Sequence, residues 1–147
     1  MLLTEFLYEA IYQPEGTQKV PRTVLQQPMI WAYVKDFGKL PDDICQVAIV
    51  DGLIVGAAWS RLGCSYGKID DSTPELAISV YPEYRYKGIG TRLLSSLLDF
   101  LSKKGYVKVS LSVDKSNYAT GMYLKAGFEI LEERKHDYIM FKRWNNE

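Results

Sequence analysis

The 147-residue chain carries 18 Lys and Arg and 18 Asp and Glu, so its formal net charge is zero. Because the basic residues are scattered, no long-range field would attract a nucleic acid, and no nucleic-acid partner is expected. No apolar run approaches the roughly 18 residues of a membrane helix, and no basic segment followed by an apolar run indicates a secretory signal. We therefore expect a cytoplasmic protein without a membrane partner.

The length indicates one domain, residues 1–147, with a single hydrophobic core. The two cysteines, Cys45 and Cys64, match neither a metal-binding spacing nor a C-x-x-C motif. We expect both to be reduced, buried thiols, and we expect no metal site.

The N-terminal quarter is predicted to be helical. A first helix is expected over residues 1–12, where apolar side chains recur at helical spacing: Leu2, Leu3, Phe6, Leu7, Ala10 and Ile11. The Pro14-Glu15-Gly16 sequence ends it. A second helix is predicted from about Arg22 to Phe37, interrupted or bent near Pro28, and Tyr33 contributes to its apolar surface.

Strands and helices alternate in the rest of the chain. Gln46–Val50 and Leu53–Arg61 are predicted to form a hairpin, because Asp51-Gly52 is a strong hairpin-turn signal. A polar loop follows over Leu62–Thr73. The remaining predicted elements are a strand at 76–80, a helix ending at Gly105, a strand at 107–113, a helix at 117–126 ending at Gly127, and a hairpin of strands 128–134 and 138–143. This order predicts an α/β protein with a mixed sheet covered by helices on both faces.

The most informative stretch runs from Pro74 to Leu94. An apolar strand breaks at Pro82 and crosses the turn Arg85-Tyr86-Lys87-Gly88-Ile89-Gly90 into a helix. Such a turn leaves several backbone N–H groups without partners, and the helix dipole adds positive potential. Glycine at positions 88 and 90 lets the backbone approach a ligand closely. We therefore predict an anion-binding turn.

Three other interpretations of this turn are possible. A dinucleotide fingerprint requires a third glycine where this chain has Leu93. A nucleoside-triphosphate loop requires Gly-Lys-Ser/Thr, which is absent. A strand–helix turn without any ligand is the remaining alternative.

Two motifs resemble those of the GCN5-related N-acetyltransferase (GNAT) superfamily. Arg85-x-x-Gly88-x-Gly90 is similar to the loop that binds the acyl-CoA pyrophosphate, and Asn117-Tyr118-Ala119 followed by Tyr123-Leu124-Lys125-Ala126-Gly127-Phe128 is similar to the N-x-A-x-x-x-Y-x-x-x-G-F helix. The resemblance covers residues 44–144. It implies a mostly antiparallel twisted sheet, acetyl-CoA as co-substrate, and transfer of the acetyl group to a primary amine of a small molecule or peptide by direct attack.

The resemblance also implies the residues that bind acetyl-CoA. The pantetheine would lie along the backbone of Ile78, Ser79 and Val80. The pyrophosphate would bind the N–H groups of the turn, with charge screened by Arg85, Lys87 or Arg92. Asn117 would bond the pantetheine arm or cap its own helix. The turn residues assigned to the cofactor are Arg85, Tyr86, Lys87, Gly88, Ile89, Gly90 and Thr91.

Two residues are candidates for proton transfer. Tyr123 matches the motif tyrosine and is expected to donate a proton to the departing thiolate, the alternative being a core tyrosine. Glu75 is the candidate general base, although a solvated glutamate or a water chain to a carboxylate are alternatives. The face that Glu75 uses depends on a strand bulge. In ribosomal-protein acetyltransferases of the superfamily, a glutamate stands where this chain has Ser112, so peptide N-terminal acetylation of that type is not favoured.

Alternatives remain for the function and the assembly. The same fold could bind acyl-CoA without turnover, as a sensor or regulatory domain, or the chain could be a small structural domain. His136 is expected to be solvated.

Family members usually begin with a strand before the first helix, and no such strand precedes residues 1–12 here. The uncovered strand, 46–50, or the C-terminal hairpin at 128–144 is therefore expected to form a homodimer, with a monomer as the alternative.

Overall fold

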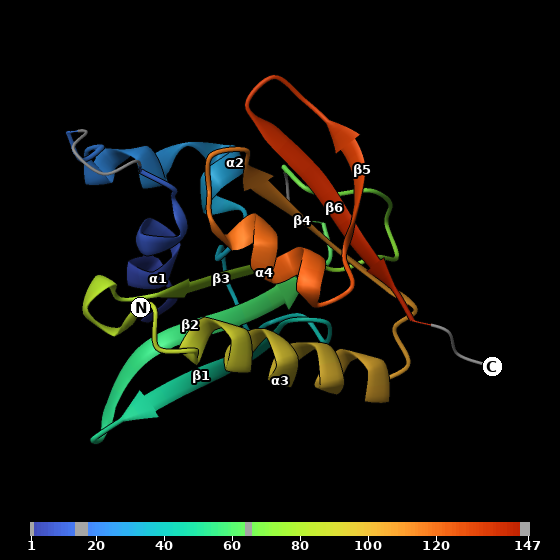
Figure 1. Ribbon diagram of the computed structural model, residues 1–147, viewed down its shortest axis with the longest axis horizontal. Helices are drawn as coiled ribbons and strands as arrows, with labels where there is room; N and C mark the ends of the chain where they lie inside the picture. Colours follow the sequence, from blue (N-terminus) through green and yellow to red (C-terminus); the bar gives the residue numbers. More distant parts are fainter. Residues whose placement is uncertain (1, 14–17, 64–65, 145–147) are drawn as a thin grey trace.

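The computed structural model describes residues 2–13, 18–63 and 66–144. These residues form one six-stranded sheet in the order β1-β2-β3-β4-β6-β5 (Figure 1). The strands are β1 (Ile44–Val50), β2 (Leu53–Arg61), β3 (Glu75–Val80), β4 (Lys108–Asp114), β5 (Glu129–Glu133) and β6 (Asp137–Arg143). The helices are α1 (Leu2–Ala10), α2 (Pro28–Trp31), α3 (Ile89–Lys103) and α4 (Ala119–Lys125), with short 3₁₀ turns at Arg22–Gln26 and Pro82–Tyr84. β3 and β4 are parallel and the other neighbouring strands are antiparallel, so the predicted fold class is confirmed.

Helices cover both faces of the sheet. Successive strand residues point to opposite faces, so apolar residues in a row give each face a surface against which helices can pack. In β2, Ala58 joins a core with the buried leucines of α3, whereas Ala57 and Trp59 pack against α1 and the segment around α2. Phe6 of α1 and Leu97 of α3 are both fully buried, one on each face of the sheet.

The predicted β1–β2 hairpin is confirmed, and the backbone explains it. Asp51 and Gly52 both have positive φ angles, 50° and 81°, as a two-residue turn of this type requires. Gly105 and Gly127, each with φ of 98°, follow the ends of α3 and α4 as predicted.

The helix predicted from Arg22 to Phe37 is interrupted at Pro28, which is one of the two forms expected there, but no regular helix continues to Phe37. This segment forms a 3₁₀ turn at Arg22–Gln26, the single turn of α2 that begins at Pro28, and further turns up to Gly38. Proline at 28 has no N–H and disfavours helical backbone in the preceding residue, so it begins a new turn rather than bending a continuous helix. Tyr33 therefore lies in a turn.

Parts of two other predictions fall on residues outside those described. The sequence Pro14-Glu15-Gly16 and the thiol of Cys64 both lie there. Cys45 is half-buried and reduced, and burial raises the pKa of its thiol. Within the described ranges, no helix has the length and apolar character needed to cross a bilayer.

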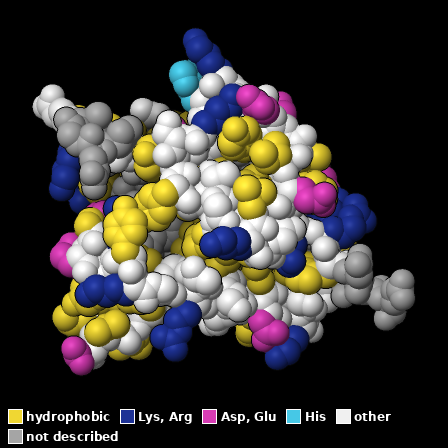
Figure 2. Space-filling model, viewed as in Figure 1, with side chains coloured by type: hydrophobic (Ala, Val, Ile, Leu, Met, Phe, Trp, Pro, Cys, Tyr) yellow, Lys and Arg dark blue, Asp and Glu magenta, His cyan; other side chains and the backbone are white. Residues whose placement is uncertain are grey.

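The edges of the sheet are β1 and β5. Exposed apolar side chains gather over the β1–β2 turn and beside β5 (Figure 2). They include Ile49, Leu53, Ile130 and Leu131. Apolar edges of this kind can pair with another chain, so the homodimer remains a prediction.

Candidate active site

β3 and β4 separate shortly after they meet. Their register contains one pair, Glu75 with Ser110, where the Ser110 amide also donates to the Pro74 carbonyl at 3.0 Å. Beyond that pair, β3 continues along β2 and β4 continues along β6. Among the described residues, no strand therefore pairs with the β4-facing edge of β3 beyond the Glu75–Ser110 pair.

A cleft of about 1270 Å³ opens where the two strands diverge. Residues 76–80 of β3 and 112–114 of β4 line it, together with the end of α1, the turn before α3 and the start of α4. Ile78, Ser79 and Val80, which sequence analysis assigned to the pantetheine, all lie along this cleft. The Ser79 hydroxyl donates to the Phe6 carbonyl at 2.7 Å, so that side chain also ties α1 to β3.

The predicted glycine turn forms one end of the cleft. The first backbone hydrogen bond of α3 runs from the Arg92 amide to the Gly88 carbonyl at 3.1 Å. Among the described residues, the amides of residues 86–91 make no hydrogen bond. Gly88 has φ of 82°, and Tyr86, which is not glycine, has φ of 61°. Left-handed backbone at a non-glycine residue is costly, and it occurs in turns such as that of Asp51 as well as at active sites.

Gly90 has a different reason to be glycine. Its φ is ordinary, and a Cβ built on it would lie 3.8 Å from the Met122 Sδ and 4.0 Å from Val80 Cγ2, which are normal contacts. The protein itself therefore leaves room for a side chain at this position. The space beside Gly90 lies in the cleft, where a ligand could approach the backbone.

The basic side chains near the turn differ in their surroundings. The Arg85 Nε donates to the Val80 carbonyl at 2.8 Å, and its Nη2 lies 3.5 Å from a Glu9 carboxylate oxygen. Arg85 therefore joins β3 to α1 as well as lining the cleft. Lys87 is exposed, with its Nζ 5.7 Å from the centre of the Tyr84 ring, and Arg92 is exposed on α3.

Tyr123 of α4 lies on the wall of the cleft and is buried. Its ring packs edge-on against Phe128, with 5.7 Å between ring centres. Burial raises the pKa of its phenol well above the usual value, and the neighbouring Tyr118 adds to the shift. Tyr123 therefore keeps its proton throughout the physiological pH range.

The start of α4 closes the cleft opposite the turn. The Asn117 Oδ1 accepts from the Ala119 amide at 2.9 Å, so Asn117 makes the helix-start contact that sequence analysis considered, while also lining the cleft. The rings of Tyr86 and Tyr118 stack at 5.2 Å and link the turn to this helix.

Glu75 is 2% exposed and does not line the cleft. Its Oε2 accepts hydrogen bonds from the Tyr33 hydroxyl and from the Gly67 amide, the latter at 2.9 Å. The β2–β3 register runs without interruption, so β3 has no bulge. Glu75 is thus a buried acid rather than the solvated glutamate considered as an alternative, and Tyr33 lies in the cleft wall beside it.

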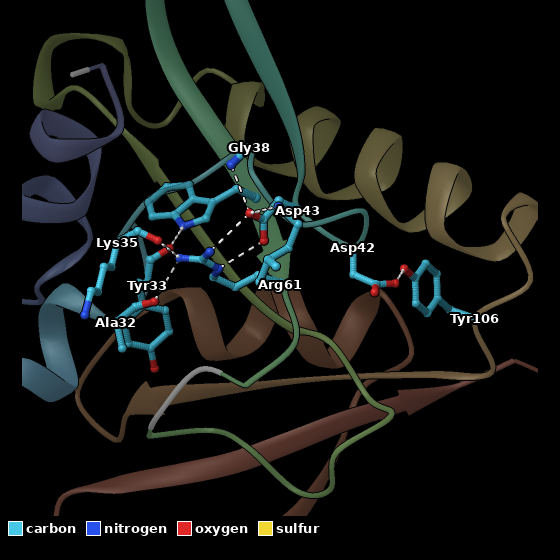
Figure 3. Close-up of polar contacts among 10 residues, drawn as sticks. Ala32, Tyr33, Lys35, Gly38, Asp42, Asp43, Arg61 and Tyr106 are labelled. Carbon is cyan, nitrogen blue, oxygen red and sulfur yellow. Dashed lines mark hydrogen bonds and ion pairs between the residues drawn. The ribbon is translucent and has the colours of Figure 1, made fainter.

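Contacts from β2 hold the turn that carries Tyr33 (Figure 3). The Trp59 Nε1 donates to the Tyr33 carbonyl at 3.0 Å. The Arg61 Nη1 donates to the carbonyls of Ala32 and Lys35 at 3.2 and 2.7 Å. The Tyr33 backbone is therefore fixed by neighbours on both sides.

Sequence reasoning missed the roles of Tyr33 and Gly67. Tyr33 had been assigned to a helix surface, and its partner Glu75 lies 42 residues away. Gly67 fell in a polar loop, but a Cβ there would lie 2.6 Å from the Leu111 carbonyl carbon and 2.8 Å from Glu75 Oε2. Neither relationship has a local sequence signal. Ser112 and the exposed His136 also line the cleft.

The arrangement can be compared with known proteins. Residues 7–128 match the acetyltransferase (GNAT) family. The chain belongs to that family. The family resemblance inferred from the glycine turn and the motif around Tyr123 is thereby confirmed.

Two curated relatives carry acetyltransferase names. The GNAT chain is 33% identical over 101 residues to the probable N-acetyltransferase camello of Xenopus tropicalis, covering 65% of this chain and 45% of that protein. It is 31% identical over 98 residues to N-alpha-acetyltransferase 50 of Danio rerio, covering 65% and 57%. The chain thus spans about half the length of these relatives.

Solved structures share the fold. The PaiA N-acetyltransferase of Thermoplasma acidophilum, in complex with coenzyme A, superimposes with a TM-score of 0.66 at 24% identity, covering 97% of this chain and 91% of that one. YncA of Salmonella typhimurium, with acetyl-CoA, gives a TM-score of 0.68 at 20% identity, covering 99% and 88%. At these identities the likeness concerns the fold.

Proposed function

We propose that this GNAT chain transfers the acetyl group of acetyl-CoA to a primary amine by direct attack. The observation that carries the proposal is the cleft between β3 and β4, with the unpaired edge of β3 along one wall and the amides of residues 86–91 at one end. An unpaired strand edge can hydrogen-bond an extended amide-bearing chain. An amide-rich helix start can bind a pyrophosphate. The pantetheine and pyrophosphate of acetyl-CoA supply both groups.

The residues present fit such a ligand. Ile78, Ser79 and Val80 would pair with the pantetheine, and residues 86–91 would hold the pyrophosphate. The open space beside Gly90 accommodates a group that a side chain would displace. Because the Arg85 guanidinium is bonded to Val80 and Glu9, we assign the screening of phosphate charge chiefly to Lys87 and Arg92, and the positioning of the turn to Arg85.

The chemistry requires a neutral amine and a stabilised leaving thiolate. Holding the amine against the thioester can lower the barrier by as much as ~7–11 kcal/mol in favourable cases. Tyr123, which is protonated at neutral pH, is the proposed donor to the thiolate. Glu75 is the proposed final acceptor of the proton from the amine. The acceptor is a small molecule or a peptide.

Calorimetry with acetyl-CoA and a screen of amine acceptors test this function. The screen includes small amines, amino acids and peptides, with free-thiol release measured against time and the acetylated product identified by mass spectrometry. Binding together with transfer to an amine is the expected result. Binding without transfer to any amine would instead identify an acyl-CoA sensor, and failure to bind would leave a structural domain.

A further inference from the structure

Glu75 is separated from the cleft by the residue it bonds. The carboxylate is 2% exposed, whereas Tyr33 lines the cleft and donates its hydroxyl proton to Glu75 Oε2. A carboxylate in this position cannot take a proton from an acceptor amine by direct contact. A hydroxyl that contacts both partners can pass one proton on as it receives another.

Resting on the acetyl transfer proposed above, we propose that Tyr33 is a catalytic residue that relays the proton from the acceptor amine to Glu75. The ammonium N–H bond breaks as an O–H bond forms on Tyr33, and the original Tyr33 proton moves to Glu75 Oε2. The net change converts an ammonium and a carboxylate into a neutral amine and a carboxylic acid. Glu75 returns its proton to water after the product leaves.

The remaining bonds then balance. The neutral amine attacks the thioester carbon, a C–N bond forms and the C–S bond breaks. The nitrogen loses its second proton to water, the thiolate gains a proton from Tyr123, and the Tyr123 phenolate recovers a proton from water. Overall, one ammonium and one thioester give one amide, one thiol and one proton.

The surroundings of the two cleft tyrosines favour different roles. The Tyr33 hydroxyl is bonded to a carboxylate, so it is set to pass a proton towards Glu75. The Tyr123 phenol lies buried beside Phe128, is protonated at neutral pH as an ordinary tyrosine is, and takes the donor role. Groups whose environments differ in this way divide the acid and base work of a site.

The carboxylate and the hydroxyl are both held firmly. The Gly67 amide donates to Glu75 Oε2 from the loop side. Gly67 packs so closely against Leu111 that any larger residue would force the loop away from Glu75. Trp59 and Arg61 fix the turn on the Tyr33 side. Such preorganisation is needed for a proton to pass within hydrogen-bonding distance.

The test compares Tyr33→Phe, Glu75→Gln and the double variant, using two acceptors of nearly equal shape. Ethylamine is protonated at neutral pH, whereas 2,2,2-trifluoroethylamine is largely neutral and needs no proton removed before attack. For ethylamine we expect kcat to fall by about 10²-fold in each single variant, as for the loss of a general base. For trifluoroethylamine the loss should be under about threefold. The double variant should be no slower than either single variant, because the two residues act as a unit.

Tyr106→Phe is the matched control, since Tyr106 also donates its hydroxyl to a carboxylate, that of Asp42, away from the cleft (Figure 3). Its turnover should equal that of the wild type. Calorimetry with acetyl-CoA checks that each variant is folded and binds normally. An equal loss of kcat with both amines, or additive losses in the double variant, would overturn the relay while leaving acetyl transfer intact. If the wild type acetylates no amine at all, the proposed function fails and the relay fails with it.

Discussion

Arg61 of β2 and Asp43, which precedes β1, form a buried ion pair with two contacts, Nε to Oδ1 and Nη2 to Oδ2, each at 3.1 Å (Figure 3). Asp43 also accepts from the amides of Gly38 and Leu40, at 2.9 and 3.3 Å. Through Nη1 the same guanidinium holds the turn that carries Tyr33. This pair therefore connects the sheet to one wall of the cleft.

Asp43→Asn should destabilise the protein by about 3 kcal/mol, because it leaves the Arg61 charge buried with no carboxylate partner. The side chains of Asp43 and Arg61 are 0% and 6% exposed, so water cannot replace the lost partner. Urea unfolding followed by circular dichroism measures the change. Asp99→Asn breaks the exposed pair with Lys103 and serves as the control, with a loss under about 1 kcal/mol. Equal effects of the two substitutions would contradict the assignment.

Gly90→Val should abolish acetyl-CoA binding and leave the protein folded. The position has an ordinary φ and room for a Cβ, so the added methyl groups would occupy the space assigned to the ligand. Gly121→Val, in α4 with nothing within 4 Å of its Cβ position, is the control and should bind normally. Calorimetry with acetyl-CoA gives both affinities. Wild-type affinity in Gly90→Val would remove the turn from the binding site.

Gly88 is not an equivalent position for this test. Its φ of 82° strains any residue with a Cβ, so Gly88→Val combines a loss of ligand contact with a loss of stability of about 1–2 kcal/mol. The free energy of unfolding of Gly88→Val must therefore be measured together with its affinity for acetyl-CoA, to separate the two effects.

Tyr123→Phe should lower kcat more than it weakens acetyl-CoA binding. The phenol is proposed to protonate the leaving thiolate, so its loss slows the chemical step. The phenyl ring of the variant keeps the packing against Phe128. Pre-steady-state measurement of thiol release isolates that step, and a loss of about 10²-fold or more is expected for a general acid. An unchanged rate with chemistry limiting would make Tyr123 a packing residue.

Tyr106 should contribute to stability at neutral pH but not at high alkaline pH. Burial, and then its bond to Asp42, raise the pKa of Tyr106 to about 12. In the unfolded chain a tyrosine titrates near ~10. The contribution is thus present below pH ~10 and is lost as the pH rises towards 12, since the unfolded chain ionises first. Tyr106→Phe should flatten the fall in unfolding free energy over this range. An unchanged slope would show that Tyr106 ionises alike in both states.

The protein should be a homodimer at micromolar concentration. The edges of the sheet, β1 and β5, expose apolar residues that pairing across a two-fold axis would cover. Sedimentation equilibrium distinguishes the dimer from a monomer of 16.8 kDa. Ile49→Lys and Leu131→Lys then identify the edge, because a charge at the paired edge should shift the equilibrium to monomer. A monomer mass throughout for the wild type rules out a stable dimer.

Local signals in the sequence determined most of the elements and the glycine turn at one end of the cleft. The Asp51-Gly52 turn, the glycines after α3 and α4, and the strand–glycine–helix passage at 74–94 each depend on neighbours within a few residues. Backbone sterics and helix periodicity act over that range. The same locality explains why residues 22–37 form only short helical turns: their apolar spacing is compatible with a helix, but Pro28 interrupts it and tertiary contacts hold the turn of Tyr33.

Only the tertiary structure decided where β3 and β4 separate and what surrounds Glu75. The sequence placed Glu75 at the start of a strand, but its burial follows from the loop at Gly67 and the turn at Tyr33, which approach it from distant parts of the chain. Tyr33 in turn depends on Arg61 and Trp59. Contacts of this kind leave no local pattern because they arise when separate segments pack together, so only the fold reveals what surrounds Glu75 and Tyr33.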